Sequence, residues 1–157
     1  MESYSIRKAK ENEWEDAMSL AWRTFEVFES PIYSARGRES FLEFISSNEL
    51  YSMFRNGDYK LFLAIEKSKI IGLISLRART HISLLFVDEK YHKKGIGREL
   101  IKYAAMFVRE EYKEKSMTVN AAPGATGFYH KIGFKDMGAE AYNDGITYFP
   151  MKYNFES

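Results

Sequence analysis

In the first third of the chain, hydrophobic residues recur with the period of an α-helix. Residues 11–30 place six of them on one helical face: Trp14, Met18, Ala21, Trp22, Phe25 and Phe28. Residues 38–47 repeat this pattern over a shorter length, and residues 48–58 predict a helical turn. We expect these hydrophobic faces to pack in the core.

From residue 59 onward the pattern changes to the alternation that is typical of β-strands. The predicted strands are residues 3–9, 59–66, 70–78, 81–87, 116–121, 134–142 and 146–155, and the two later helices are residues 95–112 and 125–133. The helix 95–112 would join strands 81–87 and 116–121 as a βαβ crossover. This order predicts a single α/β domain over residues 1–157, built on a mixed (α+β) sheet flanked by helices.

Composition and charge narrow the range of functions. Lys and Arg number 23 against 22 Asp and Glu, and this balance argues against nucleic acid or an anionic membrane as a partner. The chain has no Cys, which excludes disulfides, thiolate metal sites and a cysteine nucleophile. We expect no metal. The first residues form no secretory signal, and no apolar run is long enough to span a membrane, so we expect a cytoplasmic protein.

The stretch "KKGIGREL" places two glycines between a predicted strand and a predicted helix. The first turn of a helix carries free N–H groups and the positive end of the helix dipole. Gly95 and Gly97 remove Cβ atoms that would hold an anion away, and Lys93, Lys94 and Arg98 add positive charge. The pattern therefore favours a pyrophosphate site. The alternative is that Gly97 only allows the helix to pack tightly on the sheet.

Two common phosphate-binding motifs do not fit this loop. The Walker A motif needs a second glycine followed by Lys and Ser or Thr, but Gly97 is followed by Arg98 and Glu99. The dinucleotide-binding fingerprint needs a third glycine where the chain has Leu100, and it expects the loop after the first strand of the domain.

A third pattern fits better. The stretch "FVDEKYHKKGIGRELI" resembles the acetyl-CoA loop of the GCN5-related N-acetyltransferases (GNATs), whose signature is Gln/Arg-x-x-Gly-x-Gly/Ala. Here the signature runs from His92 to Gly97, and His92 replaces the usual Gln or Arg. The stretch "TVNAAPGATGFYHKIGF" resembles the second family motif, an Asn at a strand end before a helix reading F-Y-x-K-x-G-F. The order of elements matches the family over essentially the whole chain.

The resemblance implies the GNAT fold, in which a central, mostly antiparallel sheet splays between two strands and holds the pantetheine arm of acetyl-CoA. Those strands would be residues 81–87 and 116–121. An N–H near Val87 would point at the thioester oxygen and stabilise negative charge there. The implied cofactor-binding residues are Leu85, Phe86, Val87, His92, Lys93, Lys94, Gly95, Ile96, Gly97, Arg98, Asn120 and Tyr129.

The resemblance also implies direct acetyl transfer to an amine, without the cysteinyl acyl-enzyme that the absence of Cys excludes. Tyr129 matches the general-acid tyrosine of the family, although it shares a helical face with Ala125 and Ile132 and could be a core residue. His81 lies where many members carry a basic Glu, and its unperturbed pKa of about 6.5 suits a proton acceptor. A solvated histidine at a strand end is the alternative.

The resemblance implies an acceptor site between the first two helices, their loop and the last strands. The candidates are Glu26, Phe28, Glu29 and Tyr33 on one side and Tyr148 and Met151 on the other. The two glutamates could attract a cationic amine, or they could belong to a solvated helix face. We expect a small-molecule or peptide amine as acceptor, and the resemblance is compatible with a homodimer through the last strands.

Two other functions stay open on the sequence alone. The first is an acyl-CoA-binding module or sensor on the same fold, which His92 and the missing family Glu would allow. The second is a nucleotide-binding protein that uses the glycine loop differently, which the two failed motifs disfavour.

Overall fold

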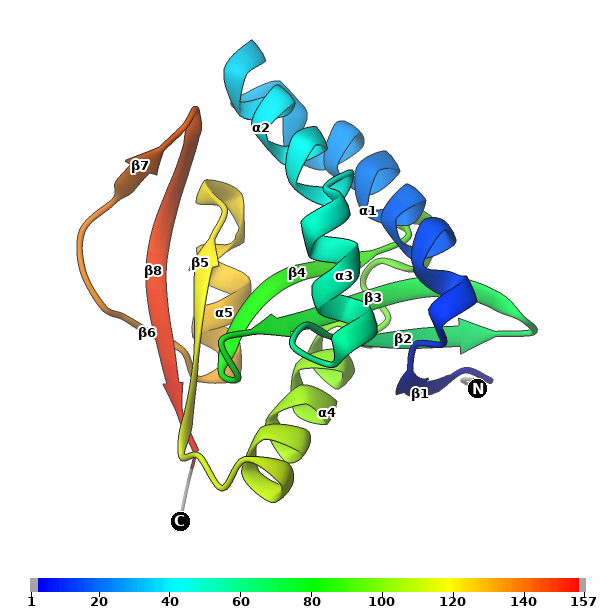
Figure 1. Cartoon of the computed structure of the whole chain (residues 1–157). Helices are drawn as coiled ribbons and strands as arrows, with labels where there is room; N and C mark the ends of the chain where they lie inside the picture. Colours follow the sequence, from blue (N-terminus) through cyan, green and yellow to red (C-terminus); the bar gives the residue numbers. More distant parts are fainter. Residues whose placement is uncertain (1–2, 156–157) are drawn as a thin grey trace.

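One eight-stranded sheet organises the chain in the computed structural model, which describes residues 3–155 (Figure 1). Its strands are β1 (Ser5–Lys8), β2 (Lys60–Glu66), β3 (Lys69–Arg77), β4 (His81–Val87), β5 (Ser116–Ala121), β6 (Lys135–Asp136), β7 (Ala141–Asn143) and β8 (Ile146–Asn154). The strand order is β1-β2-β3-β4-β5-β8-β6, and β7 also pairs with β8. Among the strand pairs of the described residues, only β4–β5 is parallel, so the predicted mixed, mostly antiparallel sheet is confirmed.

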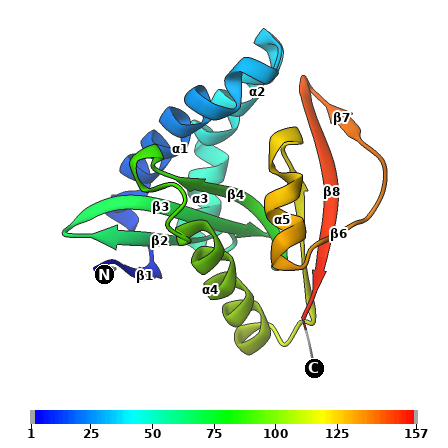
Figure 2. The same cartoon turned by 180° about the vertical axis from the view of Figure 1, so that it is seen from behind.

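Helices cover both faces of this sheet (Figures 1 and 2). They are α1 (Trp14–Phe28), α2 (Ala35–Ile45) and α3 (Asn48–Asn56) on one face, and α4 (Ile96–Glu111) and α5 (Thr126–Ile132) on the other. Successive side chains of a strand point to opposite faces of the sheet. Leu61 and Leu63 of β2 therefore pack under α1, whereas Phe62 and Ala64 pack under α4. None of the helices within the described part of the chain is long and apolar enough to cross a membrane.

Two predicted elements differ from the structure. The predicted turn at 48–58 contains a nine-residue helix, α3, which Ser47 caps at its start and Gly57 ends in a left-handed conformation. The predicted strand 134–142 is instead two short strands, β6 and β7, which pair with different parts of β8. The residues between them, 137–140, are all exposed. Because no side chain of this stretch is buried, nothing holds it on the sheet as a continuous strand.

The splay of the sheet lies between β4 and β5. These strands pair only where His81 meets Thr118 and Ile82 meets Val119. Beyond this point they diverge (Figure 1), while β5 continues along β8 from Ser116 to Ala121. The second half of β4 therefore has no strand partner on its β5 side, and this opening positions the site described next.

Candidate active site

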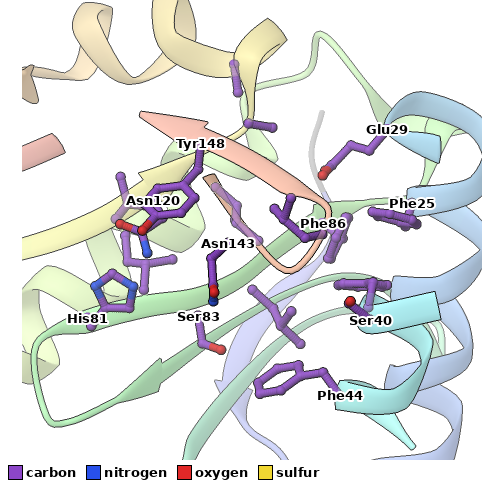
Figure 3. Close-up of a pocket in the computed structure, with 18 of the residues that line it drawn as sticks. Phe25, Glu29, Ser40, Phe44, His81, Ser83, Phe86, Asn120, Asn143 and Tyr148 are labelled. Atoms are coloured by element: carbon purple, nitrogen blue, oxygen red, sulfur yellow. The ribbon is translucent and has the colours of Figure 1, made fainter. Parts of the chain in front are cut away.

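A cavity of about 400 Å³ fills the opening between β4 and β5 (Figure 3). Its walls come from α1, α2, β4, β5, α5 and the β7–β8 hairpin. It brings together eight of the residues predicted from the sequence: Glu29, Tyr33, His81, Leu85, Phe86, Asn120, Tyr129 and Tyr148. Aromatic side chains from α1 and α2 form much of one wall, where Phe25 stacks on Phe41 with ring centroids 4.2 Å apart.

The backbone of β4 presents polar groups that have no strand partner to this opening. The Asp88 N–H donates to the Ile71 carbonyl at 2.8 Å, which marks a hydrogen-bonded pair between β3 and β4. Such pairs alternate along antiparallel strands. Leu85 opposite Ile74 and Val87 opposite Gly72 are then non-hydrogen-bonded pairs. The N–H and C=O groups of Leu85 and Val87 therefore point away from β3, and an extended amide chain can add to this edge as a strand would.

His92 lies at the end of this open edge. Its Nε2 atom lies 2.6 Å from the Val87 carbonyl oxygen, and its ring stacks on Phe28 with centroids 4.6 Å apart. The imidazole thus links the glycine loop to the last residue of α1. A ligand that pairs with the Val87 carbonyl competes with His92 for that oxygen.

The glycine loop forms the start of α4, as predicted. Gly95 precedes the helix with a φ of 80°, a left-handed conformation that favours glycine, and no side chain caps the helix there. The first N–H groups of α4 are free of intrahelical partners. The three cations at this helix start, Lys93, Lys94 and Arg98, are exposed. An uncapped helix start beside three cations fits a pyrophosphate.

Gly97 serves packing as well. A Cβ atom at this position would lie 3.2 Å from the Phe128 ring of α5. The close packing that the sequence offered as an alternative therefore exists, but its main partner is α5 rather than the sheet. Gly97 can serve both tight packing and phosphate binding. Because it has no side chain, the Phe128 ring can pack against it on one side while its backbone stays accessible on another.

Tyr129 is 6% exposed on α5 and belongs both to the core and to the cavity wall. Its ring meets Phe128 and Phe134 edge-on, at centroid distances of 5.1 and 5.2 Å. Burial raises the pKa of the Tyr129 phenol well above its usual value, and the charge of Glu29 adds to this shift. The phenol therefore stays protonated and can donate a hydrogen bond into the cavity.

His81 begins β4 at the closed end of the splay. Its Nδ1 atom lies 2.8 Å from the Thr118 hydroxyl. Burial, helped by the nearby Arg77 charge, lowers the pKa of His81 to about 4. The imidazole is neutral at physiological pH, so it can accept a proton, but it is a weak base.

Glu29 follows the last residue of α1. Burial raises the pKa of its carboxyl to about 7. The position adds to this effect, because the negative end of the α1 dipole disfavours a second negative charge. Burial also raises the pKa of Tyr33 to about 12, with a smaller contribution from the Glu29 charge.

Three predicted acceptor residues lie away from the cavity. The Glu26 carboxylate is exposed and pairs with Arg38. Phe28 is 46% exposed and stacks on His92. Met151 has no exposed surface and packs in the core beneath α4 and α5, because it lies on the face of β8 that these helices cover.

Sequence reasoning missed the side of the cavity where the β7–β8 hairpin meets α2. The Asp144 carboxylate accepts hydrogen bonds from Arg36 Nε at 2.8 Å and Arg36 Nη2 at 2.9 Å. The Ser40 hydroxyl donates to the Asp144 carbonyl at 2.7 Å. These partners are more than 100 positions apart, so no local pattern could have joined them. The gap between the predicted strands 134–142 and 146–155 places a turn at residues 143–145, but the site on α2 where this turn docks was not predicted.

Comparison with known proteins decides the family. Residues 29–155 match the family described as "Acetyltransferase (GNAT) domain". The chain belongs to the GNAT family. As a member of this family it is an N-acetyltransferase, and GNAT acetyltransferases use acetyl-CoA.

Relatives of this GNAT chain span its whole length. The peptidyl-lysine N-acetyltransferase YjaB of Escherichia coli is 26% identical over 153 residues, which cover 94% of this chain and 92% of that protein. Among solved structures, PaiA N-acetyltransferase from Thermoplasma acidophilum, in complex with coenzyme A, has a TM-score of 0.80 at 22% identity over 98% of this chain and 100% of that one. A GCN5-related N-acetyltransferase from Rhodopseudomonas palustris has a TM-score of 0.84 at 18% identity over 99% and 98%. These likenesses confirm the predicted GNAT fold.

Proposed function

We propose that this GNAT member transfers the acetyl group of acetyl-CoA directly to a primary amine of a small molecule or peptide. The observation that carries the proposal is the single cavity that joins the open edge of β4 to Tyr129 and Asn120. A binding site for an extended amide chain and a protonated phenol thus face the same space.

The chain's own groups fit acetyl-CoA as follows. The backbone of Leu85 and Val87 would pair with the pantetheine amides, and Asn120 would hydrogen-bond the same arm from β5. The loop from His92 to Arg98 would hold the pyrophosphate through its N–H groups and its cations. The Val87 N–H would polarise the thioester carbonyl, where negative charge develops during attack.

In the proposed reaction, the neutral amine attacks the thioester carbon. A C–N bond forms and the C–S bond breaks, and the departing sulfur receives a proton through Tyr129. His81 is the proton acceptor that the sequence suggests, and it lines the same cavity. Its lowered pKa of about 4 makes it a poor acceptor for a proton from an alkylammonium, whose pKa is far higher.

Thermal unfolding with acetyl-CoA, CoA, ATP and NAD tests the cofactor assignment. Ligand at about a hundred times its Kd stabilises the fold by roughly 2.7 kcal/mol, a shift of several degrees for a domain of this size. We expect this shift with acetyl-CoA and CoA only. An equal shift with ATP or NAD, or none with acetyl-CoA, would contradict the proposal.

A panel of primary amines then separates an enzyme from an acyl-CoA-binding module. Transfer releases the CoA thiol, which a thiol reagent detects without interference because the chain has no Cys. Acetyl-CoA binding without thiol release across small amines and lysine peptides would favour the binding module.

A further inference from the structure

Glu29 reaches the cavity from the side opposite β5. In Figure 3 its side chain extends from the end of α1 toward the cavity, whereas Asn120 and Tyr148 approach from the other side. Its charge also influences Tyr33 and Tyr129, which line the same space. Glu29 and Tyr129 therefore line the same cavity.

The Glu29 carboxylate has no hydrogen-bond or ion-pair partner among the side chains that the structure describes. Other glutamates of the first helical segment are paired: Glu13 binds Arg7 at 2.7 Å, and Glu26 binds Arg38. Glu29 is half-buried, and taking a carboxylate partly out of water without giving it a partner costs stability, because the lost hydration is not replaced. Its position in the cavity wall leaves this carboxylate available to a bound substrate.

The other titratable groups that line the cavity do not suit proton uptake from an ammonium. They are Tyr33, Arg77, His81, Tyr129, Asp144 and Tyr148. Burial raises the pKa of Tyr33 and Tyr129, so both phenols are protonated at neutral pH, and the Arg77 guanidinium is a cation that cannot take up a proton. Asp144 is held ionised by Arg36 and Ser40, which lower its pKa. His81 is neutral but a weak base.

We infer that Glu29 is the proton acceptor for the incoming amine, an inference that rests on the acetyl transfer proposed above. The acceptor enters as an alkylammonium, R–NH₃⁺, and gives one proton to the Glu29 carboxylate. The neutral amine then attacks the thioester carbon and forms the C–N bond. A second proton passes from nitrogen, by way of Tyr129, to the departing sulfur, and the third stays on the amide nitrogen. Glu29 later releases its proton to water, so the balance is R–NH₃⁺ plus acetyl-CoA to R–NH–acetyl plus CoA–SH plus H⁺.

The position of Glu29 on the proton path is supported by its titration range. A group that titrates at about pH 7 is divided between its two forms near neutral pH and can both take up and release a proton. An exposed carboxylate titrates near 4.3 and would be a much weaker base.

Glu29→Gln is the central variant, and Glu15→Gln on the exposed face of α1 is its matched control. We expect kcat/KM for the best amine to fall about a hundredfold or more in Glu29→Gln and to stay within about twofold in Glu15→Gln. The shift of unfolding temperature with acetyl-CoA should be the same in all three proteins. In the wild type, kcat/KM should rise with pH near pH 7, and this rise should disappear in Glu29→Gln. Measuring the profile with two amines of different pKa distinguishes titration of the enzyme from titration of the substrate.

Stability gives a second readout that needs no activity. The folded-state pKa of Glu29 lies above its unfolded value, so its contribution is fully present below about pH 4.5 and is lost as the pH rises through 7. Glu29→Gln should therefore unfold at a higher temperature than wild type at pH 8, and this difference should shrink toward pH 4.5. Equal unfolding temperatures at pH 8 would mean that the carboxylate is solvated or paired, and would overturn the inference.

The outcomes separate the two proposals. Wild-type turnover with an unchanged pH profile in Glu29→Gln would overturn the role of Glu29 and leave acetyl transfer standing. If the rise in kcat/KM persists in Glu29→Gln but vanishes in His81→Asn, His81 is the acceptor. A wild-type protein that neither binds acetyl-CoA nor releases its thiol would overturn both proposals.

Discussion

Gly37 of α2 and Gly145 of the β7–β8 turn pack backbone against backbone. A Cβ atom on Gly37 would lie 2.4 Å from the Gly145 carbonyl oxygen, and one on Gly145 would lie 2.4 Å from the Gly37 nitrogen. The paired Arg36 and Asp144 lie next to this contact. The hairpin is therefore fastened to α2 at the cavity wall, where Ser40 and Asp144 both line the space.

Replacing Gly37 with alanine should loosen this contact. Gly37 has no left-handed backbone, so the effect of Gly37→Ala is steric: the new methyl group displaces the Gly145 carbonyl. We expect a loss of about 1–3 kcal/mol in the free energy of unfolding. KM for the amine should rise, while the shift of unfolding temperature with acetyl-CoA persists. Gly138→Ala is the control, because a Cβ there meets nothing within 4 Å. An unchanged KM would show that the hairpin does not shape the acceptor site.

Tyr129→Phe tests proton donation to the departing sulfur. The variant keeps the buried ring and its contacts with Phe128 and Phe134, so the fold should remain as stable as wild type. We expect kcat to fall by about 10²-fold with little change in acetyl-CoA affinity. Steady-state kinetics measure the first quantity and thermal shift the second. Tyr142→Phe, at an exposed residue outside the cavity, is the control. A wild-type kcat in Tyr129→Phe would assign this tyrosine to packing alone.

His81 should make the fold sensitive to acid. Its folded pKa, about 4, lies below the unfolded value of about 6.5, so the unfolded state binds protons first. The contribution of His81 is fully present above pH 6.5 and is lost as the pH falls to 4. His81→Asn should flatten the fall of unfolding temperature over this window. Glu29 contributes with the opposite sign between about pH 4.5 and 7, so the effect of His81 should be clearest in the Glu29→Gln background. A steep fall that survives His81→Asn would assign the acid sensitivity to other groups.

The parts of this molecule that follow from short-range pattern were predictable. The alternation in residues 81–87 and the glycines at 95 and 97 define β4 and the start of α4, and the resemblance to the GNAT family implied the opening between β4 and β5. What escaped prediction depends on distant contacts. The strand predicted at 134–142 is split because β6 and β7 pair with different parts of β8. Met151 is buried because it lies on the face of β8 that the helices cover.

The interpretation of single ionisable residues shows the same limit. The sequence singled out His81 as a proton acceptor and Glu29 as a residue that could attract a cationic amine. How readily each takes up a proton depends on its burial and on the charges around it. Arg77 lies near His81 and disfavours its protonation, whereas Glu29 lies in a wall without a cation partner. Neither environment can be read from neighbouring residues along the chain.

His92 gives the last prediction, because its side chain occupies the Val87 carbonyl that pantetheine would use. Removing the imidazole in His92→Ala frees this acceptor. One hydrogen bond contributes about 0.5–1.5 kcal/mol net, so acetyl-CoA should bind about two- to tenfold more tightly to the variant. Isothermal titration with acetyl-CoA measures the change.

Phe28→Ala is the matched variant for His92, since it removes the stacked ring but keeps the imidazole and its bond to Val87. If the stack holds His92 in place, this variant should also bind acetyl-CoA more tightly, by a smaller factor. Weaker binding in His92→Ala alone would mean that the imidazole contacts the cofactor directly. The residue would then act as a ligand-binding side chain in the loop, as the sequence motif suggests, and its bond to Val87 would be an arrangement of the ligand-free protein.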